Sequence, residues 1–151
     1  MKDAEVIQRK GLLFIRPMCL TEDGLWISTL YPAKLSCDAD KHEIGTAVRE
    51  ALNNSTTGVD PPSDWSEVYE PLLRSAGLRS YSAFLKGAVS CVVEERGDVI
   101  RFDPSENNGK YFQSLGDECM VVVSGNADAE TLADALERAL NACTVHDKRR
   151  R

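Results

Sequence analysis

The chain has 151 residues, a formal net charge of −6, and a composition of 42% hydrophobic and 28% charged residues, which is typical of a globular protein and excludes a disordered or membrane-spanning chain. No apolar run approaches the roughly 20 residues that cross a bilayer. The first six residues carry charges of both signs and lack the apolar core of a signal peptide. These features predict one domain that stays in the cytoplasm.

The charge of the chain indicates what kind of molecule it binds, and its cysteines indicate their redox state. Four adjacent bases, Lys148 to Arg151, close the sequence, so the remainder is more acidic than the net charge indicates. An acidic surface repels nucleic-acid phosphates and favours basic proteins. The five cysteines are odd in number and form no C-x-x-C pair, which favours reduced thiols. We expect a single domain over 1–151, with a folded body from about 12 to 143 and a basic tail over 144–151.

After a polar start, two short apolar segments predict a β-hairpin. Leu12–Ile15 is an apolar run too short for a helix and is closed by Arg16-Pro17. Trp26–Tyr31 follows across a turn centred on Asp23-Gly24. Pro32 lacks a backbone donor and is expected to end the second strand.

Two helical segments are predicted in the first half of the chain, separated by a stiff proline loop over 59–63. Residues 40–53 place apolar side chains on one helix face, and Gly45 within them predicts close packing against a neighbour. A second helix begins near Asp64, which is expected to cap it with Glu67 three residues on. Pro71 predicts a kink or two short pieces, and 80–86 predicts a brief further helix.

The second half of the chain predicts more strands and a closing helix. Val89–Glu94 and Val99–Phe102 form the strongest hairpin signal, followed by a polar loop over 103–109. The uniformly apolar run 119–123 predicts a central strand covered on both faces. Residues 129–142, capped by Asn126 or Asp128, predict a helix whose buried stripe contains Leu132, Ala133, Leu136, Leu140 and Cys143. The fold class is therefore α+β, with helices packed on a mostly antiparallel sheet.

Residues suited to catalysis are sparse. His42 lies at the start of a helix and His146 in the tail, without a partner spaced for a nucleophilic dyad or a metal site. Glu94 and Glu95 are adjacent in a strand and should point in opposite directions, and Asp103–Glu106 lacks the ligand spacing of a calcium loop. We predict no cofactor, no metal and no enzymatic activity. An enzyme whose carboxylates are brought together from distant positions remains the alternative.

An acidic segment with aromatic residues is the strongest candidate for binding. Four acids lie within 11 residues beside two aromatic residues and next to the proline loop. This pattern fits either helix capping with a solvated face or an electronegative patch with aromatic anchors for a basic protein such as a nuclease. The predicted partner-binding residues are Asp60, Trp65, Glu67, Tyr69 and Glu70. If these residues do not contact a partner, Glu94, Glu95, Asp98 and 103–106 are the next candidates.

The chain resembles a known family along three segments: 24–32, which reads GLWISTLYP; Leu35-Ser36; and 43–55, which reads EIGTAVREALNNS. They are similar to immunity proteins of bacterial contact-dependent growth inhibition systems, the CdiI group, and the similarity in outline extends from about 12 to 142. The resemblance implies a cytoplasmic protein that binds and blocks the C-terminal toxin domain of a CdiA effector. Such toxins are often nucleases, frequently acting on tRNA. The resemblance transfers no binding residue, and a non-catalytic adaptor or regulatory subunit remains a further alternative.

Overall fold

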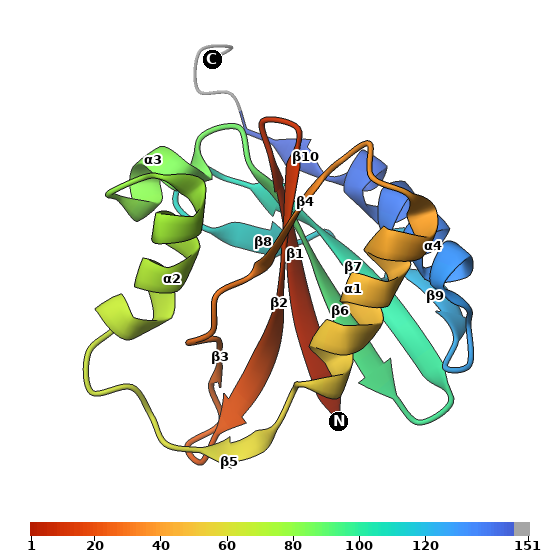
Figure 1. The fold of residues 1–151 in the computed structure, drawn as a ribbon, viewed down its shortest axis with the longest axis horizontal. Helices are drawn as coiled ribbons and strands as arrows, with labels where there is room; N and C mark the ends of the chain where they lie inside the picture. The colour runs from red at the N-terminus through yellow and green to blue at the C-terminus, as the bar shows by residue number, and fades with distance from the viewer. Residues whose placement is uncertain (147–151) are drawn as a thin grey trace.

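The structure, a computed structural model, describes residues 1–146. Four α-helices and one short 3-10 helix occur in this range (Figure 1). The α-helices are α1 (Lys41–Asn53), α2 (Ser66–Ala76), α3 (Tyr81–Leu85) and α4 (Ala129–Ala142), and the 3-10 helix η1 is Asp117–Cys119. No helix within 1–146 is both long and apolar enough to span a bilayer. Residues 147–151, the greater part of the predicted basic tail, lie outside the described residues.

The strands form one sheet with the path order β10-β7-β6-β1-β2-β3. Strands β4 and β5 also pair with β2, while β8 and β9 also pair with β7. Among residues 1–146, only the β2–β5 and β7–β10 pairings are parallel, which confirms the predicted α+β class with a mostly antiparallel sheet. The strands are β1 (Lys2–Arg9), β2 (Leu12–Thr21), β3 (Trp26–Ile27), β4 (Ala33–Ser36), β5 (Thr57–Val59), β6 (Val89–Arg96), β7 (Val99–Asn107), β8 (Phe112–Ser114), β9 (Val121–Ser124) and β10 (Thr144–Val145).

Helices α1 and α4 cover one face of the sheet, which we call the α1–α4 face. Alternate residues of β1, β6 and β7, including Val6, Val93 and Phe102, are fully buried beneath these helices. The two helices approach each other closely at Gly45, where a Cβ atom would lie 1.8 Å from the carbonyl oxygen of Ala129. This contact confirms the packing role predicted for Gly45, because no larger residue fits there without separating the helices.

Helices α2 and α3 lie on the opposite face, which we call the α2–α3 face (Figure 1). Their apolar residues Leu72 and Phe84 pack against Ile7 of β1 and Phe14 of β2 in a second, smaller core. The rings of Phe14 and Phe84 meet edge to face, with centroids 5.6 Å apart. Because this cluster uses only the part of β1 and β2 nearest their connecting turn, the two helices cover one end of this face.

Several predicted elements are confirmed. The helix predicted at 40–53 is α1, the one at 129–142 is α4, and the brief helix predicted at 80–86 is α3. Asp128 caps α4 as predicted, by accepting a hydrogen bond from Thr131 N at 2.8 Å. The predicted cap of α2 at Asp64 lies one residue too early: Trp65 occupies the N-cap position, although Asp64 accepts a hydrogen bond from Ser66 N at 2.9 Å. The hairpin predicted from Val89–Glu94 and Val99–Phe102 is present as β6–β7. The predicted pairing of Leu12–Ile15 with Trp26–Tyr31 is wrong, because β2 continues through Arg16-Pro17 to Thr21; Leu12–Ile15 pairs with β4, and β3 pairs with Cys19 and Leu20.

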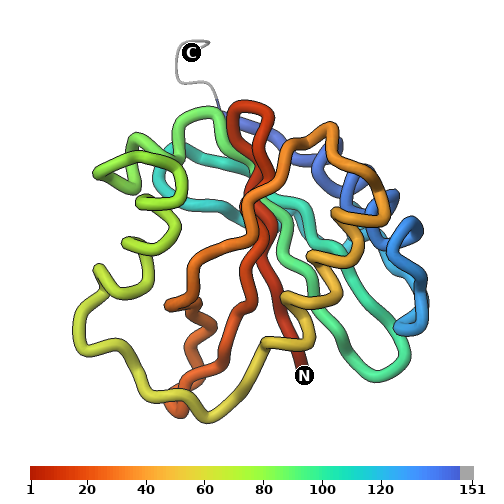
Figure 2. Tube along the Cα trace, viewed as in Figure 1, coloured from red at the N-terminus to blue at the C-terminus, as the bar shows by residue number. Residues whose placement is uncertain are grey.

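The beginning of the chain differs from the prediction. Residues 2–9, expected to precede the folded body, form β1 and pair with β2 on one side and β6 on the other. Figure 2 shows this N-terminal strand running through the middle of the molecule. Its buried apolar residues Ala4 and Val6 alternate with the charged residues Asp3 and Glu5. Alternation of this kind is typical of a strand, but the charges make the segment look like a polar terminus in the sequence. At the other end, Thr144 and Val145 are paired in β10 and are not part of a free tail.

Three boundaries also differ. The strand predicted over 26–31 stops at Ile27, and residues 103–107, expected in a polar loop, continue strand β7. Buried Ser105 and Asn107 donate side-chain hydrogen bonds to backbone carbonyls, which offsets the burial of polar residues in this strand. Pro71 lies inside a single helix, α2, instead of dividing it, because the packing of Val68 and Leu72 outweighs one missing hydrogen bond.

The apolar run 119–123 does not form the predicted central strand. Cys119 belongs to η1, and β9 begins at Val121 and pairs only with β7 among the described residues. Val121 is buried toward α4, whereas Val122 points the other way and is 54% exposed. A uniformly apolar run predicts burial on both faces, but here only the α1–α4 face is covered.

Candidate binding surface

The strand register places side chains of the α2–α3 face in rows that cross the sheet. The row Phe14–Ile7–Ser90 is buried under α2 and α3. Two residues further along each strand is the row Arg16–Glu5–Val92–Asp103, and beyond it lies the row Met18–Asp3–Glu94–Arg101–Val122. We call these last two rows the open rows, because solvent exposure rises from the first row toward the third.

A buried ion pair, Arg16 with Glu5, occupies the β2 and β1 positions of the second row, next to the end that α2 and α3 cover. Arg16 donates to Glu5 Oε1 from Nε at 3.0 Å and from Nη2 at 2.8 Å, and its Nη1 donates to the carbonyl of Val68 in α2 at 3.3 Å. Their side chains are only 6% and 15% exposed. Burial raises the pKa of the neighbouring Tyr81 to about 12, so its hydroxyl remains protonated at neutral pH. Through its hydrogen bonds to Glu5 of β1 and to the Val68 carbonyl of α2, Arg16 fixes α2 to the sheet.

The far corner of the open rows joins an acid, a base and an aromatic ring. Arg96 Nη1 lies 2.7 Å from Asp3 Oδ1 as an ion pair, without the geometry of a directional hydrogen bond. The Arg96 guanidinium also lies 5.9 Å from the centroid of the Trp26 ring, within the range of a cation–π contact. Asp3 is 4% exposed, so these groups keep its carboxylate largely out of water.

Two carboxyl groups of the open rows have raised pKa values. Partial burial raises the pKa of Glu94, the Asp3 and Asp103 carboxylates raise it further, and Arg96 and Arg101 oppose them. Partial burial also raises the pKa of Asp103, and the charge of Asp117 adds to that shift, while a hydrogen bond from Ser114 Oγ at 2.8 Å lowers it. The ionised form of each group is therefore destabilised in the folded chain.

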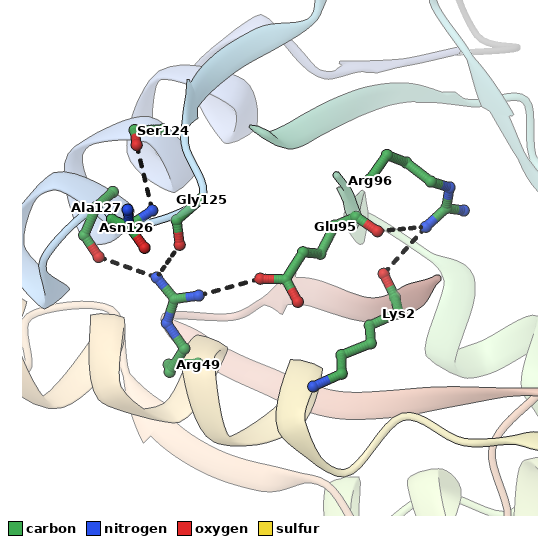
Figure 3. A network of polar contacts seen from close by, with 8 residues as sticks. All are labelled: Lys2, Arg49, Glu95, Arg96, Ser124, Gly125, Asn126 and Ala127. Carbon is green, nitrogen blue, oxygen red and sulfur yellow. Dashed lines mark hydrogen bonds and ion pairs between the residues drawn. The ribbon is translucent and has the colours of Figure 1, made fainter. Parts of the chain in front are cut away.

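The two adjacent glutamates of β6 have different environments. Glu94 belongs to the open rows, whereas Glu95 lies on the α1–α4 face and pairs with Arg49 at 3.2 Å, so they point in opposite directions as predicted. Arg49 also donates to the carbonyls of Gly125 and Ala127, at 3.1 and 2.9 Å (Figure 3). This network ties α1 to β6 and to the turn before α4. Its polar groups are engaged within the chain, which indicates a structural role.

The five predicted partner-binding residues lie along the loop after β5 and the first half of α2. Asp60, Trp65, Glu67 and Glu70 are exposed, Trp65 to 52%. Glu67 accepts a hydrogen bond from Ser63 at 2.8 Å, and Glu70 pairs with Arg74 at 2.5 Å. Tyr69 is half-buried against Tyr81, with ring centroids 4.9 Å apart. The segment is thus accessible, but contacts within the chain engage three of its five side chains.

Two hollows of the surface border the helices. A hollow of about 520 Å³ lies between α2 and α3, and two predicted residues, Tyr69 and Glu70, line it. Another, of about 340 Å³, lies between α1, α4 and the β1–β2 end of the sheet. Among residues 1–146 no group of three or more His, Cys, Asp or Glu side chains is arranged to hold a metal ion. His42 is exposed, and its backbone N–H donates to Asp40 at the start of α1.

The sequence analysis did not predict that the residues of the open rows lie side by side. Its alternative candidates included Glu94 and Asp103, but assigned Asp103 to a loop and left out Asp3, Trp26 and Arg101. The signal was present in the sequence as charges at alternate positions of β1, at Asp3 and Glu5, and of β7, at Arg101 and Asp103. A two-residue period with charged members indicates a strand face that the rest of the chain does not cover.

Comparison with known proteins gives a family match and several solved structures of the same fold. Residues 2–143 match the family model described as "CdiI: CDI immunity protein". A protein of unknown function from Neisseria meningitidis shares the fold with a TM-score of 0.78 and 22% identity, over 94% of each chain. A CdiA-CT/CdiI toxin and immunity complex from Yersinia pseudotuberculosis does so with a TM-score of 0.78 and 16% identity, over 95% of this chain and 97% of that one. No similar sequence was found among curated proteins.

Proposed function

The chain belongs to the CDI immunity protein family, CdiI, and from this membership we propose that it binds and neutralises the C-terminal toxin domain of a cognate CdiA effector. The family match over residues 2–143 carries the proposal, because it spans nearly all of the described chain. One solved structure of the same fold is itself a toxin and immunity complex. Binding without catalysis, in the cytoplasm where an incoming toxin would act, is the corresponding mode of action.

The toxin domain is further proposed to be a nuclease with a basic active site, with tRNA as a candidate substrate. This chain has a net charge of −6 and a sequence pI near 5.0. A nuclease must attract phosphates with positive charge, and an acidic inhibitor matches such a surface. Charge complementarity of this kind accelerates association and excludes partners of like charge.

Co-expression tests both parts of the proposal. Cells producing the toxin domain encoded beside this protein should stop growing, and cells producing both proteins should grow. Equal growth arrest with and without the immunity protein would overturn the assignment. RNA and DNA extracted from arrested cells separate the finer claim from the coarser one. Intact nucleic acids in cells that this protein rescues would contradict a nuclease while leaving the immunity function in place.

The predicted segment from Asp60 to Glu70 is proposed as part of the toxin contact. Replacing Asp60 and Glu67 by Lys should slow association with a basic toxin several-fold and weaken the salt dependence of the association rate, because peripheral charges act through long-range steering. Stopped-flow measurements at two or more salt concentrations provide the test. Asp64 is left unchanged because its hydrogen bond to Ser66 N stabilises the helix start.

The matched control reverses Glu50 and Glu137, exposed residues of α1 and α4 on the other side of the sheet. It makes the same change in net charge without altering the proposed contact. If both double variants associate at the wild-type rate, or if both slow equally, the segment from Asp60 to Glu70 makes no specific contribution.

A further inference from the structure

The two faces of the sheet differ in how completely the chain covers them. On the α1–α4 face, Ala4, Val93 and Phe102 are fully buried. The residues that neighbour them in sequence point to the α2–α3 face, where Glu94 is half-buried and Arg101 exposed. Helices α2 and α3 cover only the end that contains Ile7 and Phe14. Arg16, Glu5 and Asp3 at the β2 and β1 end of the open rows are largely buried, so the part left without a covering helix from residues 1–146 is the end formed by Glu94, Asp103, Arg101 and Val122.

We propose that the open rows, together with Trp26 and Arg96 at their corner, are the central docking face for a basic surface of the toxin domain. This inference rests on the proposed function and specifies its contact surface. It differs from the proposal for Asp60 to Glu70, which assigns that segment to the periphery, where charge steers the approach.

The first argument for a basic occupant is the arrangement of charge. Asp3 and Glu94 are directly opposite each other on β1 and β6, an arrangement of like charges that destabilises a sheet. Asp103 lies in the adjacent second row, and Asp117 is close enough to raise the pKa of Asp103. Arg96 and Arg101 compensate only part of this charge. A cationic partner would stabilise carboxylates that the free chain holds under repulsion and partial desolvation.

The second argument is the kind of side chain that accompanies the carboxylates. Trp and Arg are enriched among the residues that dominate interface energies, and Trp26 and Arg96 lie in contact at one corner of the open rows. At the opposite end of the third row, Val122 is an exposed apolar residue on a strand. Apolar and aromatic contacts at both ends of a charged strip match the mixed composition of a non-obligate interface.

The third argument is continuity with the segment predicted from the sequence. β5 pairs with the end of β2, and the loop that follows it leads to α2, which Arg16 fixes beside the open rows. The ring of Tyr69 packs in a tilted arrangement against that of Tyr81, next to the Arg16–Glu5 pair. On the other side, Ser114 of β8 is bonded to Asp103. The open rows therefore lie between α2 on one side and β8 on the other. The predicted segment from Asp60 to Glu70 belongs to the α2 side.

The test neutralises Glu94 and Asp103, two carboxylates whose ionised forms are destabilised in the folded chain. Glu94→Gln with Asp103→Asn should weaken affinity for the isolated toxin domain by about tenfold or more, the effect of losing a central interface contact. The free variant should unfold at the same urea concentration as the wild type or at a higher one, because it removes repulsion and desolvation. Weaker binding combined with unchanged or increased stability is the signature of a binding role, since loss of a structural contact would lower both.

The control, Glu50→Gln with Glu137→Gln, makes the same change in net charge on α1 and α4 and should alter affinity less than about twofold if long-range charge alone is affected. A second variant, Val122→Lys, changes an exposed residue of the third row and should weaken binding with little change in stability. Wild-type affinity in both the neutralised variant and Val122→Lys, while the wild-type chain binds the toxin, overturns the inference alone. Absence of binding by the wild-type chain instead overturns the proposed function.

Discussion

Arg16→Met is expected to lower the free energy of unfolding by about 3 to 5 kcal/mol at neutral pH, the usual result of leaving one member of a buried ion pair unpaired. Methionine retains the apolar stem but removes both hydrogen bonds to Glu5 and the bond to the Val68 carbonyl. The remaining partner of Glu5 is the Ser90 hydroxyl at 3.4 Å, which does not offset a buried negative charge. Urea denaturation of the purified protein measures the change.

The double variant Arg16→Met with Glu5→Met separates the cost of an unpaired charge from the value of the pair. Replacing both members of a buried pair by apolar residues is often nearly neutral, so most of the stability should return. The hydrogen bond to Val68 is not restored, and amide exchange in α2 should stay faster than in the wild type. Equal stability of the single and double variants would show that the charge of Glu5 is already satisfied by water.

The sequence predicted the elements whose periodicity is strong and whose faces are fully covered. α1 and α4 show apolar residues at helical spacing, and the predicted cap of α4 at Asp128 follows from side-chain chemistry alone. The β6–β7 hairpin was likewise predictable from its valine-rich strands. In each case, the local preference of the residues and their tertiary environment agree.

The mispredictions concentrate on the α2–α3 face. Strand β1 was missed because Asp3 and Glu5 interrupt its apolar residues, and the end of β7 was read as a loop because it contains Asp103 and Glu106. Strand β9 was placed at the centre because Val122 was expected to be covered. All three errors assume that a strand residue is apolar where it faces the protein and that each apolar face is covered within the chain. In the structure neither assumption holds: Asp3 and Glu5 are largely buried in ion pairs with Arg96 and Arg16, and Val122 is apolar but 54% exposed.

The candidate contact residues show the same limit. Composition and clustering identified the segment from Asp60 to Glu70, because its residues are adjacent in sequence. The open rows combine residues from β1, β2, β6, β7 and β9, and only the strand register brings them together. Register depends on long-range pairing, which short-range patterns in one sequence do not determine.

Leu136→Ala is expected to lower the free energy of unfolding by about 2 to 5 kcal/mol, the range for truncation of a buried leucine. Leu136 is 1% exposed in the main core, on the stripe of α4 that also contains Leu132 and Ala139. Leu136 also borders the hollow of about 340 Å³ beside α1, so truncation would enlarge an existing space. The close approach of Gly45 to Ala129 prevents α1 and α4 from moving together to fill that space.

Thermal or urea unfolding of Leu136→Ala should be compared with that of Leu25→Ala, which truncates a leucine that is 43% exposed. The exposed control should change stability by less than about 0.5 kcal/mol, the level of an ordinary surface substitution. A similarly small change for Leu136→Ala would contradict the packing of α4 on the sheet. Since α4 lies on the face away from the open rows, toxin affinity of the folded Leu136→Ala variant should equal that of the wild type. A loss of affinity beyond the fraction unfolded would instead place the toxin on the α1–α4 face.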